Sequence, residues 1–169
     1  MGFASPERGG HALDLRHAQI SDLPVTGVVE RYPAAHVVPP HSHSRGHLIY
    51  ASTGVLLVQA STGQWLVPPT TAVWLCPSVQ HQLTAVTAVT AHGIFVAERY
   101  AAQLPKNDCV VHVSPLIREL ITALVKTPHE PPFQERDALL GQLLIEELKT
   151  VAHLPFHLPW PNDGLMGKI

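Results

Sequence analysis

Short runs rich in β-branched and aromatic residues follow one another from residue 25 to residue 113, with turn residues at intervals of about ten. This pattern is typical of the antiparallel strands of an all-β sandwich or barrel. Thr53-Gly54 and Ser61-Thr62-Gly63 predict tight turns, and Pro68-Pro69 ends a strand because proline has no N–H to donate. We therefore expect consecutive antiparallel strands, over residues 27–32, 47–52, 55–60, 65–67, 72–76, 82–89, 92–97 and 109–113.

A helical period begins after Val113. Ser114 is a favourable N-cap, and Pro115 suits the first helical position because its missing N–H needs no partner there. The apolar positions that follow recur at helical spacing: Leu116, Ile117, Leu120, Ile121, Leu124 and Val125. We predict that this helix ends near Thr127-Pro128.

A second helix is predicted over residues 134–152, with an unusually wide apolar stripe. The stripe consists of Leu139, Leu140, Leu143, Leu144, Ile145, Leu148 and Val151. Packing on the β-domain and packing against a second copy of the chain both explain such a stripe. We expect a homodimer whose interface holds Leu140, Leu144, Leu148 and Val151.

These patterns divide the chain into four parts. We expect an N-terminal tail over residues 1–24, a β-domain over 25–113, a two-helix segment over 114–153 and a proline-rich linker over 154–169. The last seven residues look like the start of another helix, so a further domain is expected beyond the linker.

Composition and charge narrow the function classes. With 169 residues the chain has the size of one domain. Its net charge of −2 and its content of only 14% charged residues leave no positively charged surface of the kind that binds the phosphate backbone of DNA. No apolar run is long enough to cross a bilayer, and the first ten residues lack the pattern of a signal peptide, so we expect a cytoplasmic protein without membrane contact. Cys76 and Cys109 are too few for a disulfide framework.

Histidine is the unusual residue, with twelve in the chain. His41 and His43 are two residues apart, which in a strand places both imidazoles on one face, and His47 keeps the same parity. Imidazoles that converge in this way chelate zinc, copper, nickel or iron. His81 opens a later strand and is the candidate for a fourth ligand.

Two segments around these histidines resemble the cupin motifs. His41-x-His43-x3-His47-x6-Gly54 resembles the first motif, in which two histidines and a glutamate bind metal, with His47 at the glutamate position. Residues 77–81 resemble the second motif, whose final histidine is the fourth ligand. The sequence departs from the pattern at Ser78, where the motif has glycine, and at Ala85, where it has asparagine.

A narrower resemblance, to the N-terminal cupin of AraC-type bacterial transcription regulators, covers nearly the whole chain. It rests on residues 41–54, 63–69 and 72–81, and on His157-Leu-Pro159-Trp-Pro161 near the end. It implies a cupin jelly-roll barrel of the RmlC-like kind, all-β with two C-terminal α-helices. It also implies that the barrel senses a small molecule or a metal, that the helices dimerise, and that DNA is bound by a domain absent from this chain.

We therefore expect a sensor domain that holds a divalent transition metal through His41, His43, His47 and His81. Zinc or nickel is favoured, with iron or manganese as alternatives, and the metal is either the signal or an anchor for an organic effector. The alternative is a small metal-dependent cupin enzyme of the dioxygenase or isomerase kind. Since the set lacks the carboxylate found in many iron oxygenases, we expect a protein that is not an enzyme.

Overall fold

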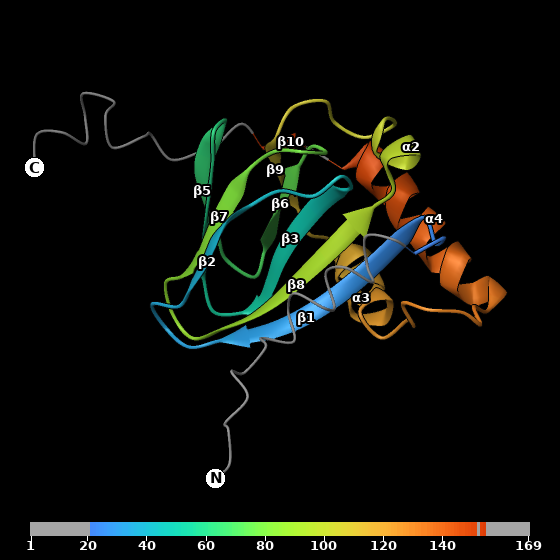
Figure 1. The fold of residues 1–169 in the computed structure, drawn as a ribbon, viewed down its shortest axis with the longest axis horizontal. Coiled ribbons are helices and arrows are strands. Elements are labelled where there is room, and N and C mark those ends of the chain that lie inside the picture. The colour runs from blue at the N-terminus through green and yellow to red at the C-terminus, as the bar shows by residue number, and fades with distance from the viewer. Residues whose placement is uncertain (1–20, 152, 155–169) are drawn as a thin grey trace, which may run out of the picture.

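The computed structural model describes residues 21–151 and 153–154, which fold into two antiparallel β-sheets flanked by helices (Figure 1). The predicted tail and linker lie almost wholly outside these residues. The larger sheet has the order β1 (Val25–Tyr32), β8 (Val89–Val96), β3 (Gly46–Thr53), β6 (Thr71–Leu75), β9 (Cys109–His112) and β10 (His153–Leu154). The smaller sheet has the order β2 (Val37–His41), β7 (His81–Ala85), β4 (Leu56–Ala60) and β5 (Gly63–Val67).

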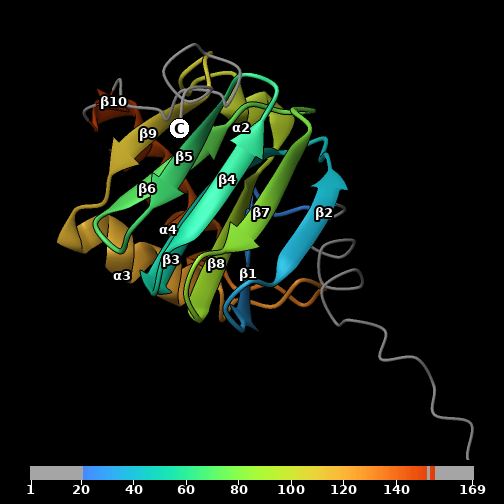
Figure 2. The same ribbon diagram turned by 90° about the vertical axis from the view of Figure 1, so that its left-hand side faces the viewer.

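The chain passes back and forth between the two sheets, which is the connectivity of a jelly roll. β4 and β5 form a hairpin as expected, but β1 pairs with β8, β3 with β6 and β8, and β2 with β7. The prediction that strands pair in sequence order is therefore wrong for most of the sheet. The predicted all-β cupin fold with C-terminal helices is confirmed, although the described strands form two separate sheets and no closed barrel (Figure 2).

Strand β2 is missing from the sequence-based prediction because Pro39 and Pro40 lie within it. Proline cannot donate a ladder hydrogen bond, and it is tolerated in a strand only where its nitrogen faces no partner. β2 is the edge strand of the smaller sheet, so one of its sides needs no ladder. The short elements α2 (Glu98–Ala101) and β10 were not predicted either.

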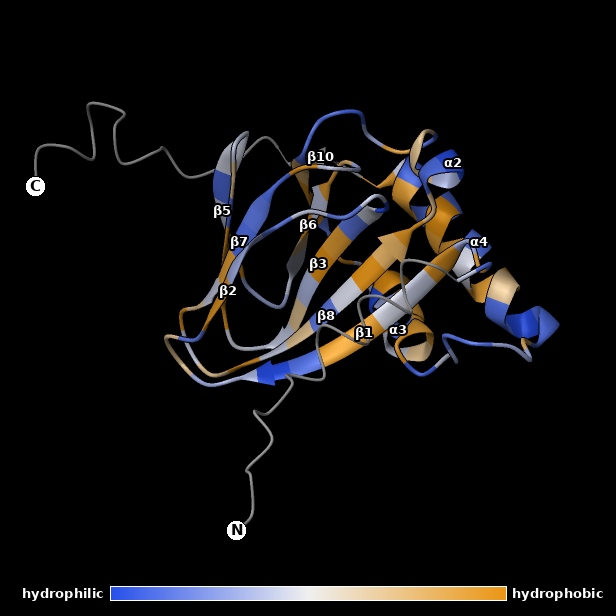
Figure 3. Cartoon of the chain, viewed as in Figure 1, coloured by the Kyte–Doolittle hydropathy of each residue, from blue (hydrophilic) through white to orange (hydrophobic). Residues whose placement is uncertain are grey.

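Both faces of β3 are buried, because the larger sheet lies between two hydrophobic cores. Ile49 and Ala51 belong to the core between the two sheets, whereas Leu48 and Tyr50 belong to the core under the helices. A strand that is covered on both faces reads as a continuous apolar run. In Figure 3 orange bands accordingly appear on both β3 and β8, with hydrophilic bands between them, and the first turn of α4 is hydrophilic.

Helix α3 (Pro115–Leu124) begins as predicted: the hydroxyl of Ser114 accepts a hydrogen bond from the backbone N–H of Ile117 at 3.1 Å. It ends three residues earlier than predicted. Helix α4 (Glu135–Thr150) begins where the carboxylate of Asp137 accepts the backbone N–H of Gln134 at 2.8 Å. Among the described residues, no helix is long and apolar enough to cross a membrane.

The structure corrects the assignment of the apolar stripe on α4. Leu144 and Leu148 are 0% and 2% exposed, buried within the chain's own core under the larger sheet. Leu140 and Val151 are half-buried and pack on the same core. Leu144 and Leu148 are therefore not available to a second subunit, contrary to the prediction. The apolar side chains that α4 exposes are those of Leu139 and Leu143.

Candidate metal centre

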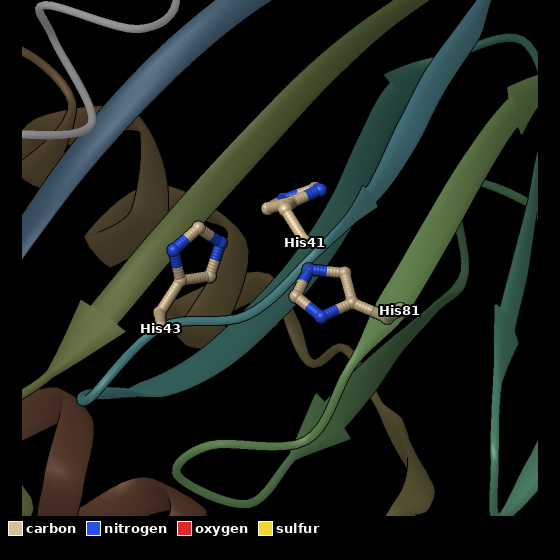
Figure 4. A group of neighbouring side chains, drawn as sticks. All are labelled: His41, His43 and His81. Carbon is tan, nitrogen blue, oxygen red and sulfur yellow. The ribbon is translucent and has the colours of Figure 1, made fainter.

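Three of the four predicted ligands come together at one end of the space between the sheets (Figure 4). His41 is the last residue of β2, His81 is the first residue of β7, and the two are opposite each other in the ladder. His43 follows in the segment that leads to β3. One nitrogen from each ring lies within 4.8 Å of the others, which is the spacing of a group able to hold a metal ion.

The sequence-based expectation that His41 and His43 lie on one face of the same strand is wrong. His41 and His43 do not share a strand, because the chain leaves the smaller sheet after His41 and enters the larger sheet at Gly46. His43 is instead held by its backbone carbonyl, which accepts a hydrogen bond from the N–H of Ser78 at 2.7 Å. Ser78 has φ +68°, in the left-handed region that glycine adopts most readily, and it stands where the cupin motif has glycine.

Backbone carbonyls orient two of the three rings. Nδ1 of His41 donates to the carbonyl of Pro39 at 2.8 Å, and Nδ1 of His81 donates to the carbonyl of Val79 at 2.9 Å. A carbonyl oxygen only accepts, so Nδ1 carries the proton in each ring and Nε2 keeps a lone pair. Metal-binding histidines usually donate their second nitrogen in this way. The side chains of His41 and His81 therefore fit a metal that is bound through Nε2.

Burial keeps His81 neutral. The side chain is 2% exposed, and desolvation lowers its pKa to about 4, although the hydrogen bond to the Val79 carbonyl acts in the opposite direction. A histidine must be neutral to coordinate a metal. His81 is therefore ready to act as a ligand at neutral pH.

His47, the fourth predicted ligand, lies beside the group and not within it. It is on β3, 5% exposed, with Nδ1 at 3.3 Å from Nε2 of His81. Its ring stacks on Phe95 of β8, with centroids 4.4 Å apart and an interplanar angle of 17°. The same phenyl ring meets His43 edge-on at 5.0 Å. Phe95 thus forms a wall for two of the four histidines.

A narrow apolar cavity adjoins the histidines between the two sheets. Its apolar lining comes from Val28, Ile49, Leu83, Ala91 and Phe95, and the imidazoles of His41 and His47 also line it. The free space is about 20 Å³, enough for one water-sized group. Glu30 and Tyr32 also line it, and burial raises the pKa of Tyr32, so its phenol stays protonated.

Sequence reasoning missed two residues of this site, Gly93 and Phe95. A Cβ atom at residue 93 would lie 3.0 Å from Nε2 of His47, so glycine gives the ring its room. An isolated glycine within a strand pattern often marks such a close approach, and this signal was present in the sequence. Phe95 reads as an ordinary core residue, and nothing in its local pattern points to the histidines.

Comparisons with known proteins point to one family. A model described as AraC-like ligand binding domain matches residues 23–148. The HTH-type transcriptional regulator NimR of Escherichia coli (strain K12) is 33% identical over 121 residues, which are 72% of this chain and 44% of NimR. The chain thus spans less than half the length of this curated relative.

Solved structures of ToxT share the fold at low sequence identity. The apo K231A variant of ToxT from Vibrio cholerae matches with a TM-score of 0.56 and 6% identity over 75% of this chain and 55% of ToxT. ToxT bound to (E)-4-(8-methylnaphthalen-1-yl)but-3-enoic acid matches with a TM-score of 0.53 and 7% identity, over 85% and 62% of the two chains. An RmlC-like cupin from Shewanella frigidimarina NCIMB 400 has a TM-score of 0.41 and 16% identity, over 45% and 68%.

Proposed function

Because the chain belongs to the family of AraC-like ligand-binding domains, we propose that it is the sensing domain of a longer transcription regulator and that its site holds a divalent metal. The ligands are His41, His43 and His81. The observation that carries this proposal is the orientation of His41 and His81, whose Nδ1 atoms are hydrogen-bonded to backbone carbonyls so that Nε2 is left for a metal. A site of neutral imidazoles suits zinc or nickel, with iron or manganese as alternatives.

DNA binding is assigned to a domain outside this chain. The relative NimR is named as a helix-turn-helix regulator, and the chain spans only 44% of it. The chain itself has a net charge of −2, which gives it no general attraction to a phosphate backbone. A regulator of this kind would act in the cytoplasm, where bacterial DNA lies.

The cavity next to the histidines supplies a place for an effector. Three protein ligands leave a position open on a tetrahedral metal. His41 lines the cavity, which has room for a water-sized group. In this proposal the open position is filled by water or by a donor atom of a small effector.

A metal-dependent enzyme is the second candidate, and one observation favours it. Three histidines next to a cavity are also the arrangement of catalytic zinc and iron sites, which keep a position open for substrate. Sustained oxygen consumption that depends on an added substrate, measured on the iron-loaded or manganese-loaded chain, would establish this function. The sensor proposal predicts no such turnover.

The metal proposal is tested by loading the purified chain with zinc or nickel at neutral pH, desalting it and measuring its metal content. We expect the unmodified chain to keep metal in stoichiometric amount. The double variant His43→Ala, His81→Ala should lose it, and the variant His112→Ala, which changes an exposed histidine on β9, should keep it. A metal-free unmodified chain, or a double variant that binds as well as the unmodified chain, would contradict the proposal.

We also propose a homodimer, now through the exposed side of α4. Leu139 and Leu143 are 55% and 43% exposed and are one helical turn apart. Large apolar side chains that adjoin on one face are typical of a contact surface. Leu144 and Leu148 then support the dimer only indirectly, by fixing α4 to the larger sheet.

A further inference from the structure

The Nε2 atom of His81 has two possible partners. Nδ1 of His81 is committed to the carbonyl of Val79 at 2.9 Å, so Nε2 is the nitrogen that carries the lone pair. Nδ1 of His47 lies 3.3 Å from this Nε2. Since Nε2 is the acceptor of this pair, Nδ1 of His47 is the donor and carries the proton.

A metal ion bound to His81 uses the same lone pair. One lone pair serves either a hydrogen bond or a metal bond, so the contact between His47 and His81 must break when the site fills. We propose that His47 is a latch: it is hydrogen-bonded to His81 while the site is free of metal, and it is released when metal binds. This inference rests on the metal site proposed above and concerns how that site is regulated.

The release of His47 changes the cavity, because the imidazole forms part of its wall. The ring is stacked on Phe95 and lies against Gly93, so it has little room on the side of β8. Its Nδ1–H loses the acceptor on His81 and can instead donate to a ligand in the cavity that the ring lines. The metal-loaded form therefore favours a small ligand with a hydrogen-bond acceptor next to the atom that binds the metal. Metal occupancy and ligand affinity are coupled through His47.

The latch predicts that removing His47 strengthens metal binding. We would titrate zinc into the unmodified chain and the variant His47→Leu, in competition with a chromophoric chelator at neutral pH, with His112→Leu as the matched control. In the unmodified chain, zinc must break the hydrogen bond between His47 and His81 before it binds. Because the variant lacks this hydrogen bond, its affinity for zinc should be roughly two- to tenfold higher. The control should bind like the unmodified chain.

Each other outcome overturns the latch in a different way. Equal affinity in the variant and the unmodified chain would mean that the contact with His81 does not oppose metal. A drop of tenfold or more would show that His47 is itself a ligand, as the cupin resemblance implies. If neither the unmodified chain nor the variant binds zinc, both the proposed metal site and the latch are wrong. If both bind zinc with the same affinity, the metal site stands and only the latch is overturned.

Nitrogen-15 NMR of the imidazoles tests the same idea on the unmodified chain. Without zinc, His47 and His81 should both carry the proton on Nδ1. With zinc, Nε2 of His81 should show the shift of a coordinated nitrogen, and His47 should keep its Nδ1 proton. A coordination shift on His47, or a contact with His81 that persists in the zinc-loaded chain, would overturn the proposal.

Discussion

Gly93 of β8 lies directly against the imidazole of His47, so that a Cβ atom at residue 93 would come within 3.0 Å of Nε2. The same Cβ would approach the side chain of Val28 to 3.3 Å. Since Phe95 also stacks on the His47 ring, the imidazole cannot move toward β8 to make room for a side chain at residue 93. The position of His47 therefore depends on the absence of a side chain at residue 93.

The substitution Gly93→Ala should destabilise the chain by about 1–3 kcal/mol, as expected when a methyl group is forced into a packed core. Urea unfolding at neutral pH measures this cost. In a His47→Ala background the clash with the ring is relieved, and the same substitution should cost clearly less. An equal cost in both backgrounds would mean that His47 is not the limiting neighbour.

Acid should destabilise the metal-free chain between about pH 6.5 and pH 4. The unfolded chain takes up a proton on His81 below its ordinary pKa of 6.5, but the folded chain does so only near 4. Protons therefore favour the unfolded state throughout this window, by up to about 3 kcal/mol at its lower end. Burial also lowers the pKa of His92, so protonation of His92 adds to the loss of stability at low pH.

Urea unfolding of the metal-free chain across this pH range checks the prediction. The variant His81→Gln should lose less stability on acidification than the unmodified chain, and His112→Gln should behave like the unmodified chain. A free energy of unfolding that stays constant down to pH 4 would show that His81 is not buried as described.

The two sides of α4 should respond differently to substitution. Leu144→Ala should cost about 2–5 kcal/mol, because its side chain is fully buried in the core. Leu139→Glu with Leu143→Glu should change the stability of the folded subunit little but convert a dimer into monomers. Unfolding curves and light scattering separate the two effects. An unmodified chain that is already monomeric at tens of micromolar would contradict the proposed dimer.

The two thiols should react slowly with disulfide reagents. Burial and the carboxylate of Asp108 raise the pKa of Cys76 to about 11, and the same two causes raise the pKa of Cys109 to about 11. The thiolate is the reactive form, so at pH 8 both thiols should react at least about tenfold more slowly in the folded chain than in urea. Asp108→Asn should speed the reaction of Cys76. Equal rates in the folded and unfolded chain would contradict this.

The sequence alone determined the features that depend on neighbouring residues and on local chemistry. Ser114 and Pro115 specify the start of α3, because a cap hydroxyl and a missing N–H act within one helical turn. The spacing of the histidines together with the cupin resemblance identified His41, His43 and His81, which the structure brings together. Family membership also followed from these motifs.

Only the tertiary structure decided which strands pair and which side of each element is covered. Pro39 and Pro40 argue against a strand, yet β2 exists because the edge of a sheet leaves one side of a backbone unpaired. The seven apolar positions of the stripe on and just after α4 look alike in the sequence, and packing against the larger sheet selects Leu144, Ile145 and Leu148 for the core. The contact of His47 with Phe95 and His81 joins β3, β8 and β7, because packing depends on distances between segments that are far apart along the chain.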